Sequence, residues 1–316
     1  MNNVIGNAKI AYNQSINKNY DSLKLLKEIY NNILNNKNVI LKANERDIAE
    51  NKGFKIDFDV IDSIMKETEK EKSLYKNKLL TQKENRITEY DSLGIIDIFF
   101  NGNTYILIEM AMKGIISHNV IILISQVEYM KYTNITICNI ITRVLKSQNI
   151  NENMVQIKCD FDLIKYCEND FIIKKAFVIG NVDLHKTLKR ISKIDTKYIG
   201  YNDCDIYVED VDSITNLKEM VLNNENVLFK IYVNKSIEVD YNDDFIYVNS
   251  VDEAIEKMEF DSCNYCSMIF SKNKENSIKF AEMSKAKYII INNTMNFDKA
   301  VDVDIKEFYC KKYIKK

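Results

Sequence analysis

The sequence predicts an α/β protein in which a helical N-terminal segment precedes a doubly wound parallel sheet and a second, smaller α/β lobe. Three observations support this fold class. Apolar residues recur at helical spacing over about the first 80 residues. Short, almost uniformly apolar runs then alternate with helical stretches, which is typical of a parallel sheet. A shorter alternating set begins at Val227 and predicts the smaller lobe.

The N-terminal segment is expected to form three helices. Asp21 and Ser22 can cap the first, whose apolar residues recur at helical spacing over 23–34. The second covers 40–51, and Gly53 is expected to be its C-terminal cap. The third is rich in charged residues and covers roughly 59–80.

Each apolar run in the first lobe is followed by a stretch with helical spacing, so strands and crossover helices alternate. The expected strands are 93–100, 119–125, 154–159, 175–180, 196–202 and 204–208, and the expected helices are 104–116, 132–149, 161–169, 184–194 and 213–224. The second lobe repeats the pattern. Its expected strands are 227–233, 244–250, 265–271 and 287–292, with helices at 251–258 and 275–286. The lysine-rich end, 310–316, is expected to be a solvated tail.

Composition excludes several classes of protein. The net charge of −2 gives no indication of a nucleic acid or a membrane surface as partner. The sequence contains no run of 18 apolar residues, and its first residues lack the order of charged and apolar residues that marks a signal peptide. An odd number of scattered cysteines, seven, favours free thiols in a reducing compartment. We therefore expect a cytoplasmic protein.

The cysteine pair in CNYC, Cys263 and Cys266, has the spacing of a redox or zinc pair. Zinc would need two further ligands, and the two histidines, His118 and His185, lie far away in the sequence. We therefore expect buried thiols, no metal site, and histidines that are structural or exposed to solvent. The acidic stretch 209–213 is expected to cap a helix.

Six stretches, in collinear order, resemble the aldehyde dehydrogenase superfamily and most closely its gamma-glutamyl phosphate reductase family, also called glutamate-5-semialdehyde dehydrogenase. The first is 40–53, ILKANERDIAENKG, which is similar to the N-terminal helix of that family. The others are 92–100 (SLGIIDIFF), 109–123 (EMAMKGIISHNVIIL), 204–223 (CDIYVEDVDSITNLKEMVLN), 248–258 (VNSVDEAIEKM) and 286–297 (AKYIIINNTMNF). Each stretch alone is a weak signal, and the shared order carries the resemblance.

The resemblance implies an aldehyde dehydrogenase-like fold with a Rossmann-like first lobe. It implies a cofactor-binding-like domain with the N-terminal helices at 1–222, a reduced catalytic-like lobe at 223–292, and a C-terminal segment at 293–316. The family reaction, in proline biosynthesis, reduces an acyl phosphate through a thiohemiacetal on a cysteine. The hydride comes from NADPH, so NADP(H) is the cofactor implied, if the chain binds one.

The nucleophile of that reaction is missing at its expected position. The resemblance places it near Lys230, Ile231 and Tyr232, and none of these is a cysteine. A cysteine is needed because its thiolate is both a strong nucleophile and a good leaving group. Cys204 is the fallback, since it stands at the start of a predicted strand of the first lobe.

The positions implied to bind ligands have also changed. At the phosphate-binding turn, Gly180 is kept but Asn181 replaces a second glycine, where a side chain would hinder the approach of a pyrophosphate. Ser125 lies where the family has a basic residue near the ribose. The substrate-binding stretch supplies Asn292, Thr294 and Asn296, so an anion-binding arginine is replaced by asparagine.

These differences lead to three hypotheses. The leading one is a degenerate, non-catalytic member of the superfamily, a pseudoenzyme that acts as a binding or assembly partner, either as a homo-oligomer or in complex with a related enzyme. The alternative is an active NAD(P)-dependent oxidoreductase that uses a relocated cysteine. The third is a nucleotide-binding sensor without chemistry.

Overall fold

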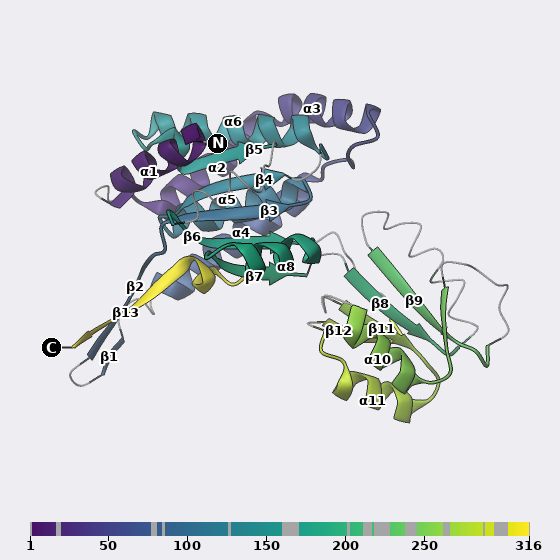
Figure 1. Ribbon diagram of the computed structural model, residues 1–316. Coiled ribbons are helices and arrows are strands. Elements are labelled where there is room, and N and C mark those ends of the chain that lie inside the picture. The colour runs from purple at the N-terminus through teal and green to yellow at the C-terminus, as the bar shows by residue number, and fades with distance from the viewer. Residues whose placement is uncertain are drawn as a thin grey trace. The chain divides into compact units, whose positions relative to one another are not determined.

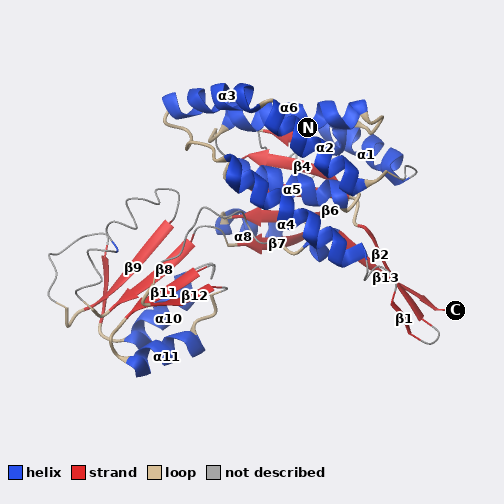
Figure 2. Cartoon of the chain, turned by 180° about the vertical axis from the view of Figure 1, so that it is seen from behind, coloured by secondary structure: helices blue, strands red, loops and turns tan. Residues whose placement is uncertain are grey.

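The computed structural model describes residues 2–16, 20–76, 81–83, 86–125, 128–159, 171–200, 203–210, 217, 228–237, 245–261, 266–286, 288–293 and 303–315. The chain forms two compact units (Figures 1 and 2). Unit 1 comprises Met1–Tyr198 and Ala300–Lys316, and unit 2 comprises Ile199–Lys299. Each unit is described by itself.

The chain begins with four helices: α1 (Asn2–Ile16), α2 (Ser22–Asn35), α3 (Lys37–Ala49) and α4 (Phe58–Lys76). Asp21 caps α2, as predicted, by accepting hydrogen bonds from the backbone N–H groups of Leu23 and Lys24. The stretch 40–53 forms most of α3 and the turn after it. Helix α1 is not predicted, because two of its three buried apolar residues, Ala8 and Ala11, are alanines, and the third is Ile5.

The predicted role of Gly53 as a helix cap is wrong. Helix α3 ends at Ala49, and the left-handed residue after it is Asn51, with φ of 55°. Asparagine tolerates this conformation better than most residues. Space near Gly53 is limited instead: a Cβ atom there would lie 2.6 Å from the sulfur of Met130 and 3.0 Å from the Cβ atom of Asp47.

The sheet of unit 1 has the order β5-β4-β3-β6-β7. Strand β3 pairs in parallel with β4 and β6, and β4 pairs in parallel with β5. Every residue of β3, β4 and α5 is buried, which explains why their sequences are continuous apolar runs. Helices lie on both faces of this sheet, with α8 in front in Figure 1 and α4 and α5 in front in Figure 2. The strands are β3 (Ile95–Phe100), β4 (Val120–Ser125), β5 (Val155–Lys158), β6 (Ile173–Ile179) and β7 (Asp195–Ile199), and the helices are α5 (Thr104–Ile116), α6 (Lys131–Ser147) and α8 (Val182–Ile191).

The C-terminal residues correct the prediction of a solvated tail. They form β13 (Tyr309–Lys315), which pairs antiparallel with β2 (Arg86–Ser92), and β2 also pairs with β1 (Thr81–Lys83). This three-stranded sheet projects from the rest of unit 1 in Figure 1. Charge alone does not reveal this strand, because its partner β2 lies far away in the sequence.

The sheet of unit 2 has the order β10-β9-β8-β11-β12, and its pairs are parallel. Helices α10 and α11 cover one face through an apolar cluster that includes Tyr207, Tyr232 and Phe280. A second cluster on the strands includes Cys204, Met268 and Phe270. The elements are β8 (Asp203–Val208), β9 (Leu228–Asn234), β10 (Phe245–Val248), α10 (Val251–Asp261), β11 (Cys266–Phe270), α11 (Lys274–Met283) and β12 (Tyr288–Ile291).

The two units therefore divide the chain differently from the predicted boundary between 222 and 223. Strand β8 was expected in the first lobe, but it pairs with β9 and β11 in the sheet of unit 2. A strand belongs to the sheet that satisfies its backbone hydrogen bonds. The order of the strands in the sequence does not reveal which sheet that is. The doubly wound α/β class itself is confirmed. Within the described residues, no helix is long and apolar enough to cross a membrane.

Candidate functional site

The structure brings together the three residues predicted to bind a cofactor. Ser125 ends β4, and Gly180 and Asn181 follow β6. Both strands pair with β3, in registers that align Ser125 with Phe100 and Val178 with Phe99. The three residues therefore lie at the carboxyl edge of the parallel sheet, which is where open α/β sheets bind ligands.

The turn after β6 has part of the geometry of a phosphate-binding turn. Gly180 has a φ of 75°, a conformation that favours glycine. Asn181, however, caps α8 with its own side chain, because its Oδ1 accepts a hydrogen bond of 2.9 Å from the N–H of Leu184. Asp183 adds a carboxylate in the first turn. A phosphate at this helix N-terminus would compete with the cap and meet a negative charge.

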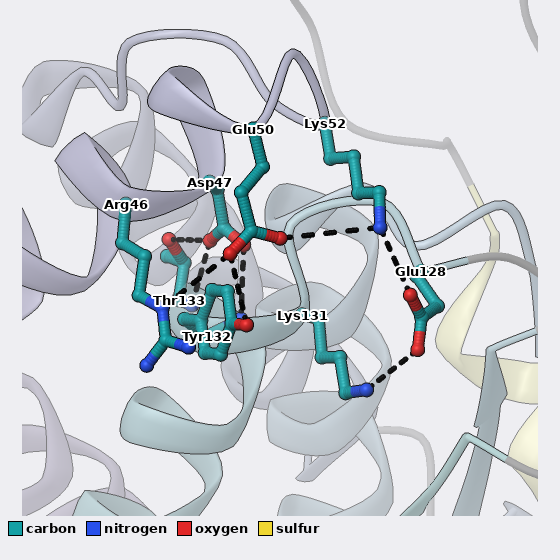
Figure 3. Close-up of polar contacts among 8 residues, drawn as sticks. All are labelled: Arg46, Asp47, Glu50, Lys52, Glu128, Lys131, Tyr132 and Thr133. Atoms are coloured by element: carbon teal, nitrogen blue, oxygen red, sulfur yellow. Dashed lines mark hydrogen bonds and ion pairs between the residues drawn. The ribbon is translucent and has the colours of Figure 1, made fainter.

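Helix α6 begins at the same edge, and a side chain from α3 caps it. Asp47 Oδ1 accepts from the N–H of Tyr132 at 3.0 Å, and its Oδ2 accepts from the N–H and Oγ1 of Thr133 at 2.9 and 2.7 Å. Figure 3 shows the carboxylate of Asp47 directed at the start of α6. The motif that resembles the family's N-terminal helix therefore supplies a cap for α6, which is a structural role.

The lysines beside this helix start are paired with a carboxylate. Glu128 accepts from Lys52 Nζ at 2.9 Å and from Lys131 Nζ at 2.6 Å (Figure 3). Hydrogen bonds from Lys131 and Lys52 lower the pKa of Glu128 to about 2. Lys52 and Lys131 are therefore already paired with a carboxylate within the protein.

In unit 2, the expected nucleophile positions lie inside strand β9. Lys230 is exposed, and Ile231 is aligned with Ile206 and Phe245 on the neighbouring strands. Tyr232 is fully buried under the helices. All three are part of a regular strand, with side chains that alternate between its faces.

The fallback nucleophile, Cys204, lies near the amino end of β8 and is 1% exposed. Its neighbours are apolar residues such as Ile206 and Met268. A thiol in this setting packs like a small apolar side chain. The structure does not give Cys204 the exposed, electropositive surroundings that are typical of catalytic cysteines.

At the carboxyl edge of the same sheet, a polar network surrounds Glu209. The carboxylate accepts hydrogen bonds from Ser271 Oγ, from Asn276 Nδ2 at 3.0 and 2.9 Å, and from the hydroxyl of Tyr207 at 3.0 Å. Ser271 Oγ also accepts from the N–H of Asn273 at 2.9 Å. The serine is thus held by structural hydrogen bonds rather than presented as a nucleophile.

An open pocket of about 530 Å³ lies beside this network. Asn292, predicted to bind substrate, lines it, while its side chain exchanges two hydrogen bonds with the backbone of Ser271 at 2.8 and 2.9 Å. The other predicted substrate residues, Thr294 and Asn296, lie outside the described residues. Lys272 also lines the pocket and forms an ion pair of 2.9 Å with Asp210.

Both histidines contact neighbouring side chains. The ring of His118 lies 4.4 Å from that of Tyr20, and burial lowers the pKa of His118 to about 4. His185 packs beside Tyr198, with ring centroids 5.5 Å apart. Across the described residues, no group of three or more His, Cys, Asp or Glu side chains is placed to hold a metal ion.

Sequence reasoning missed the network around Glu209. The acidic stretch 209–213, which begins at Glu209, was predicted to cap a helix. Residues 211–213 of this stretch lie outside the described residues. The useful signal is that Glu209 comes directly after a buried strand, as Ser271 does. Polar residues at the carboxyl ends of two neighbouring parallel strands must meet at one edge.

Comparison with known proteins bears on the fold. No protein-family model and no curated protein matches the chain. Among solved structures, gamma-glutamyl phosphate reductase from Thermotoga maritima matches with a TM-score of 0.63 at 16% identity, over 99% of this chain and 97% of that one. The Saccharomyces cerevisiae gamma-glutamyl phosphate reductase matches with a TM-score of 0.52 at 15% identity, over 99% and 96%. A glyceraldehyde-3-phosphate dehydrogenase from Methanocaldococcus jannaschii, complexed with NADP, matches with a TM-score of 0.67 at 14% identity, over 99% and 93%.

These identities are low, so the likeness concerns the fold. It covers nearly the whole chain in each comparison, in agreement with the order of the six sequence stretches. The chain has an aldehyde dehydrogenase-type fold that is similar to that of gamma-glutamyl phosphate reductase.

Proposed function

We propose that this protein uses an aldehyde dehydrogenase-type fold without the cysteine-dependent reaction, and that it acts as a binding or assembly partner. The observation that carries the proposal is the burial of Cys204. An active enzyme of this type would need Cys204 as its relocated nucleophile. It is buried among apolar side chains in the second sheet. The positions expected for the original nucleophile belong to the regular strand β9.

The carboxyl edge of the sheet of unit 1 supports the same proposal. The Methanocaldococcus jannaschii protein of similar fold was crystallised with NADP. Here, the helix start that follows Gly180 is capped by Asn181 and carries Asp183. Both features disfavour a tightly bound pyrophosphate. We therefore propose that NADP(H), if it binds, binds weakly and takes no part in a reaction.

The three-stranded sheet of unit 1 supports assembly. Strand β13 is seven residues long and lies at the edge of the order β1-β2-β13. Within the described residues, it pairs on one side only, with β2. An edge strand of this length is a template for pairing with another chain. A second copy of this protein or a related enzyme of the same fold is the proposed partner.

Two measurements test the proposal. The pure protein, given NADPH and an acyl phosphate or an aldehyde, is expected not to oxidise NADPH. NADPH oxidation that a single Cys→Ser substitution abolishes would show an active enzyme and overturn the proposal. Light scattering tests assembly separately. A self-assembled protein has a multiple of the 37.0 kDa chain mass. The assembly role is contradicted if the protein is a monomer and also fails, in a titration, to bind a related enzyme of the same fold.

A further inference from the structure

Two cysteines that are distant in the sequence are neighbours in the sheet of unit 2. Cys204 lies near the amino end of β8, and Cys266 is the first residue of β11. The parallel pairing of these strands aligns Cys266 with Cys204. The spacing in CNYC points to Cys263 as the partner of Cys266, whereas the register points to Cys204.

The side chains of the two cysteines point to the same face of the sheet. Residues aligned across a parallel pair share a face, and both cysteines belong to the apolar cluster that includes Ile206 and Met268. Each is 1% exposed. Neighbouring strands lie about 4.8 Å apart, and disulfides join Cα atoms that are roughly 4.4–6.8 Å apart. The backbone therefore already has the spacing that a disulfide requires.

We propose that Cys204 and Cys266 form a reversible disulfide, which makes the amino ends of β8 and β11 a redox modification site. The surroundings suit this product. A disulfide is neutral and has no hydrogen-bond donor, so an apolar cluster accommodates it at little cost. This proposal is independent of the proposed function, because it requires neither a nucleotide nor a catalytic thiol.

The oxidant is a low-molecular-weight disulfide. The thiolate of one cysteine attacks a sulfur of the oxidant, forms a mixed disulfide and displaces one thiolate of the reagent. The second cysteine, as its thiolate, then attacks the protein sulfur of the mixed disulfide and displaces the other thiolate. Together, the two protein thiols lose two electrons and two protons. The disulfide reagent takes up these electrons and protons and leaves as two thiols.

The location explains how a buried pair can react. Both cysteines lie at the amino ends of their strands, where fraying opens the sheet more often than in its centre. Reduced glutathione reverses the bond by the same exchange, because a thiolate that reaches the frayed strand ends attacks one of the two sulfurs.

The test is to incubate the full chain with oxidised glutathione, alkylate the remaining thiols, and map the cysteines by mass spectrometry. We expect a peptide that links Cys204 to Cys266, a mass lower by two hydrogen atoms, and loss of the link on adding reduced glutathione. The variants Cys204→Ala and Cys266→Ala should each abolish the linked peptide. Cys138→Ala is the matched control, because it removes a buried thiol of unit 1 and should leave the link intact.

Mapping of the wild-type protein alone decides the matter if a variant fails to fold. A disulfide between Cys263 and Cys266 would overturn the proposal. So would the absence of any reaction, in which Cys204 and Cys266 stay reduced during the incubation and can be alkylated only after denaturation. Glutathione bound to either cysteine without progress to the protein disulfide would also contradict it, because the aligned partner thiol should displace it.

Discussion

At the scale of single residues, His118 shows how the fold determines a protonation state. It follows α5 with a left-handed backbone, at φ of 59°, and its ring packs against Tyr20. Burial is the largest cause that lowers the pKa of His118 to about 4, and the nearby Lys72 adds to it. The imidazole is therefore neutral at pH 7, which is consistent with a structural role.

This pKa predicts how stability depends on pH. An unfolded histidine has a pKa of about 6.5, so the unfolded state binds the proton more readily. The contribution of His118 is fully present above pH 6.5 and is lost as the pH falls toward 4. Between pH 7 and pH 5 the loss is at most about 2 kcal/mol.

The variant His118→Asn tests this pH dependence, because asparagine also tolerates the left-handed backbone. We expect the free energy of unfolding of the variant, measured with urea, to fall less than that of the wild type between pH 7 and pH 5. Carboxylates that titrate in the same range affect both proteins and cancel in the difference. Equal pH slopes would show that His118 titrates normally in the folded protein.

At the scale of elements, Asp47 joins α3 to α6. Its carboxylate is 1% exposed and satisfies two backbone N–H groups and one hydroxyl at the start of α6. Replacing Asp47 by alanine leaves these donors buried without a partner. We expect Asp47→Ala to lower the free energy of unfolding by about 2–3 kcal/mol. Chemical denaturation measures this change.

Glu50→Ala is the matched control for Asp47→Ala. Glu50 follows α3 on the same surface, accepts from the Tyr132 hydroxyl at 3.0 Å, and pairs with Arg46 and Lys52 in exposed ion pairs. Exposed pairs contribute little, so the expected loss is below about 0.5 kcal/mol. A similar loss in both variants would mean that the cap of α6 is not the source of the effect.

Sequence reasoning predicted some elements well because their signals are local. Helix α5 was expected at 104–116 and is found there, since it directly follows a capping residue, Asn103. The buried strands β3 and β4 were visible as continuous apolar runs. Strand β13 was missed because its partner, β2, lies more than two hundred residues earlier in the chain. A single sequence does not show such a pairing.

The candidate site was less predictable than the elements for the same reason. The placement of Ser125, Gly180 and Asn181 at one sheet edge follows from strand order. The hydrogen bonds from Ser271 and Asn276 to Glu209, however, span 62 and 67 residues. Which distant polar residues satisfy one carboxylate depends on packing that no local pattern specifies.

At the scale of the whole molecule, the chain leaves unit 1 at Tyr198 and returns to it at Ala300. Lysine side chains of unit 1 hold the returning segment. Lys72 donates to the Tyr309 hydroxyl at 3.3 Å, and Lys113 donates to the carbonyl of Val303 at 2.5 Å. Lys175 and Lys197 both pair with Glu307, at 2.6 and 2.7 Å. These contacts span up to 237 residues of sequence, so the returning segment is part of the packing of unit 1.

Lys113 is the most deeply buried of the lysines that contact the returning segment. A variant at Lys113 therefore tests whether this segment stabilises unit 1 without affecting unit 2. The ammonium group of Lys113 also pairs with Glu109 at 2.8 Å and Glu71 at 3.3 Å. Burial alone would lower the pKa of Lys113, but the two carboxylates raise it overall. The lysine is therefore charged, and Lys113→Met leaves a buried carboxylate without its partner.

We expect Lys113→Met to destabilise unit 1 by about 3–5 kcal/mol. The double variant Lys113→Met/Glu109→Gln should recover much of that loss, because it also removes the unpaired charge. Each unit has its own apolar core, so calorimetry should show the unit 1 transition at a lower temperature and the unit 2 transition unchanged. Fluorescent labels on exposed cysteines introduced into each unit would assign the transitions. Equal shifts of both transitions would mean that the two units unfold as one cooperative body, stabilised jointly by the returning segment.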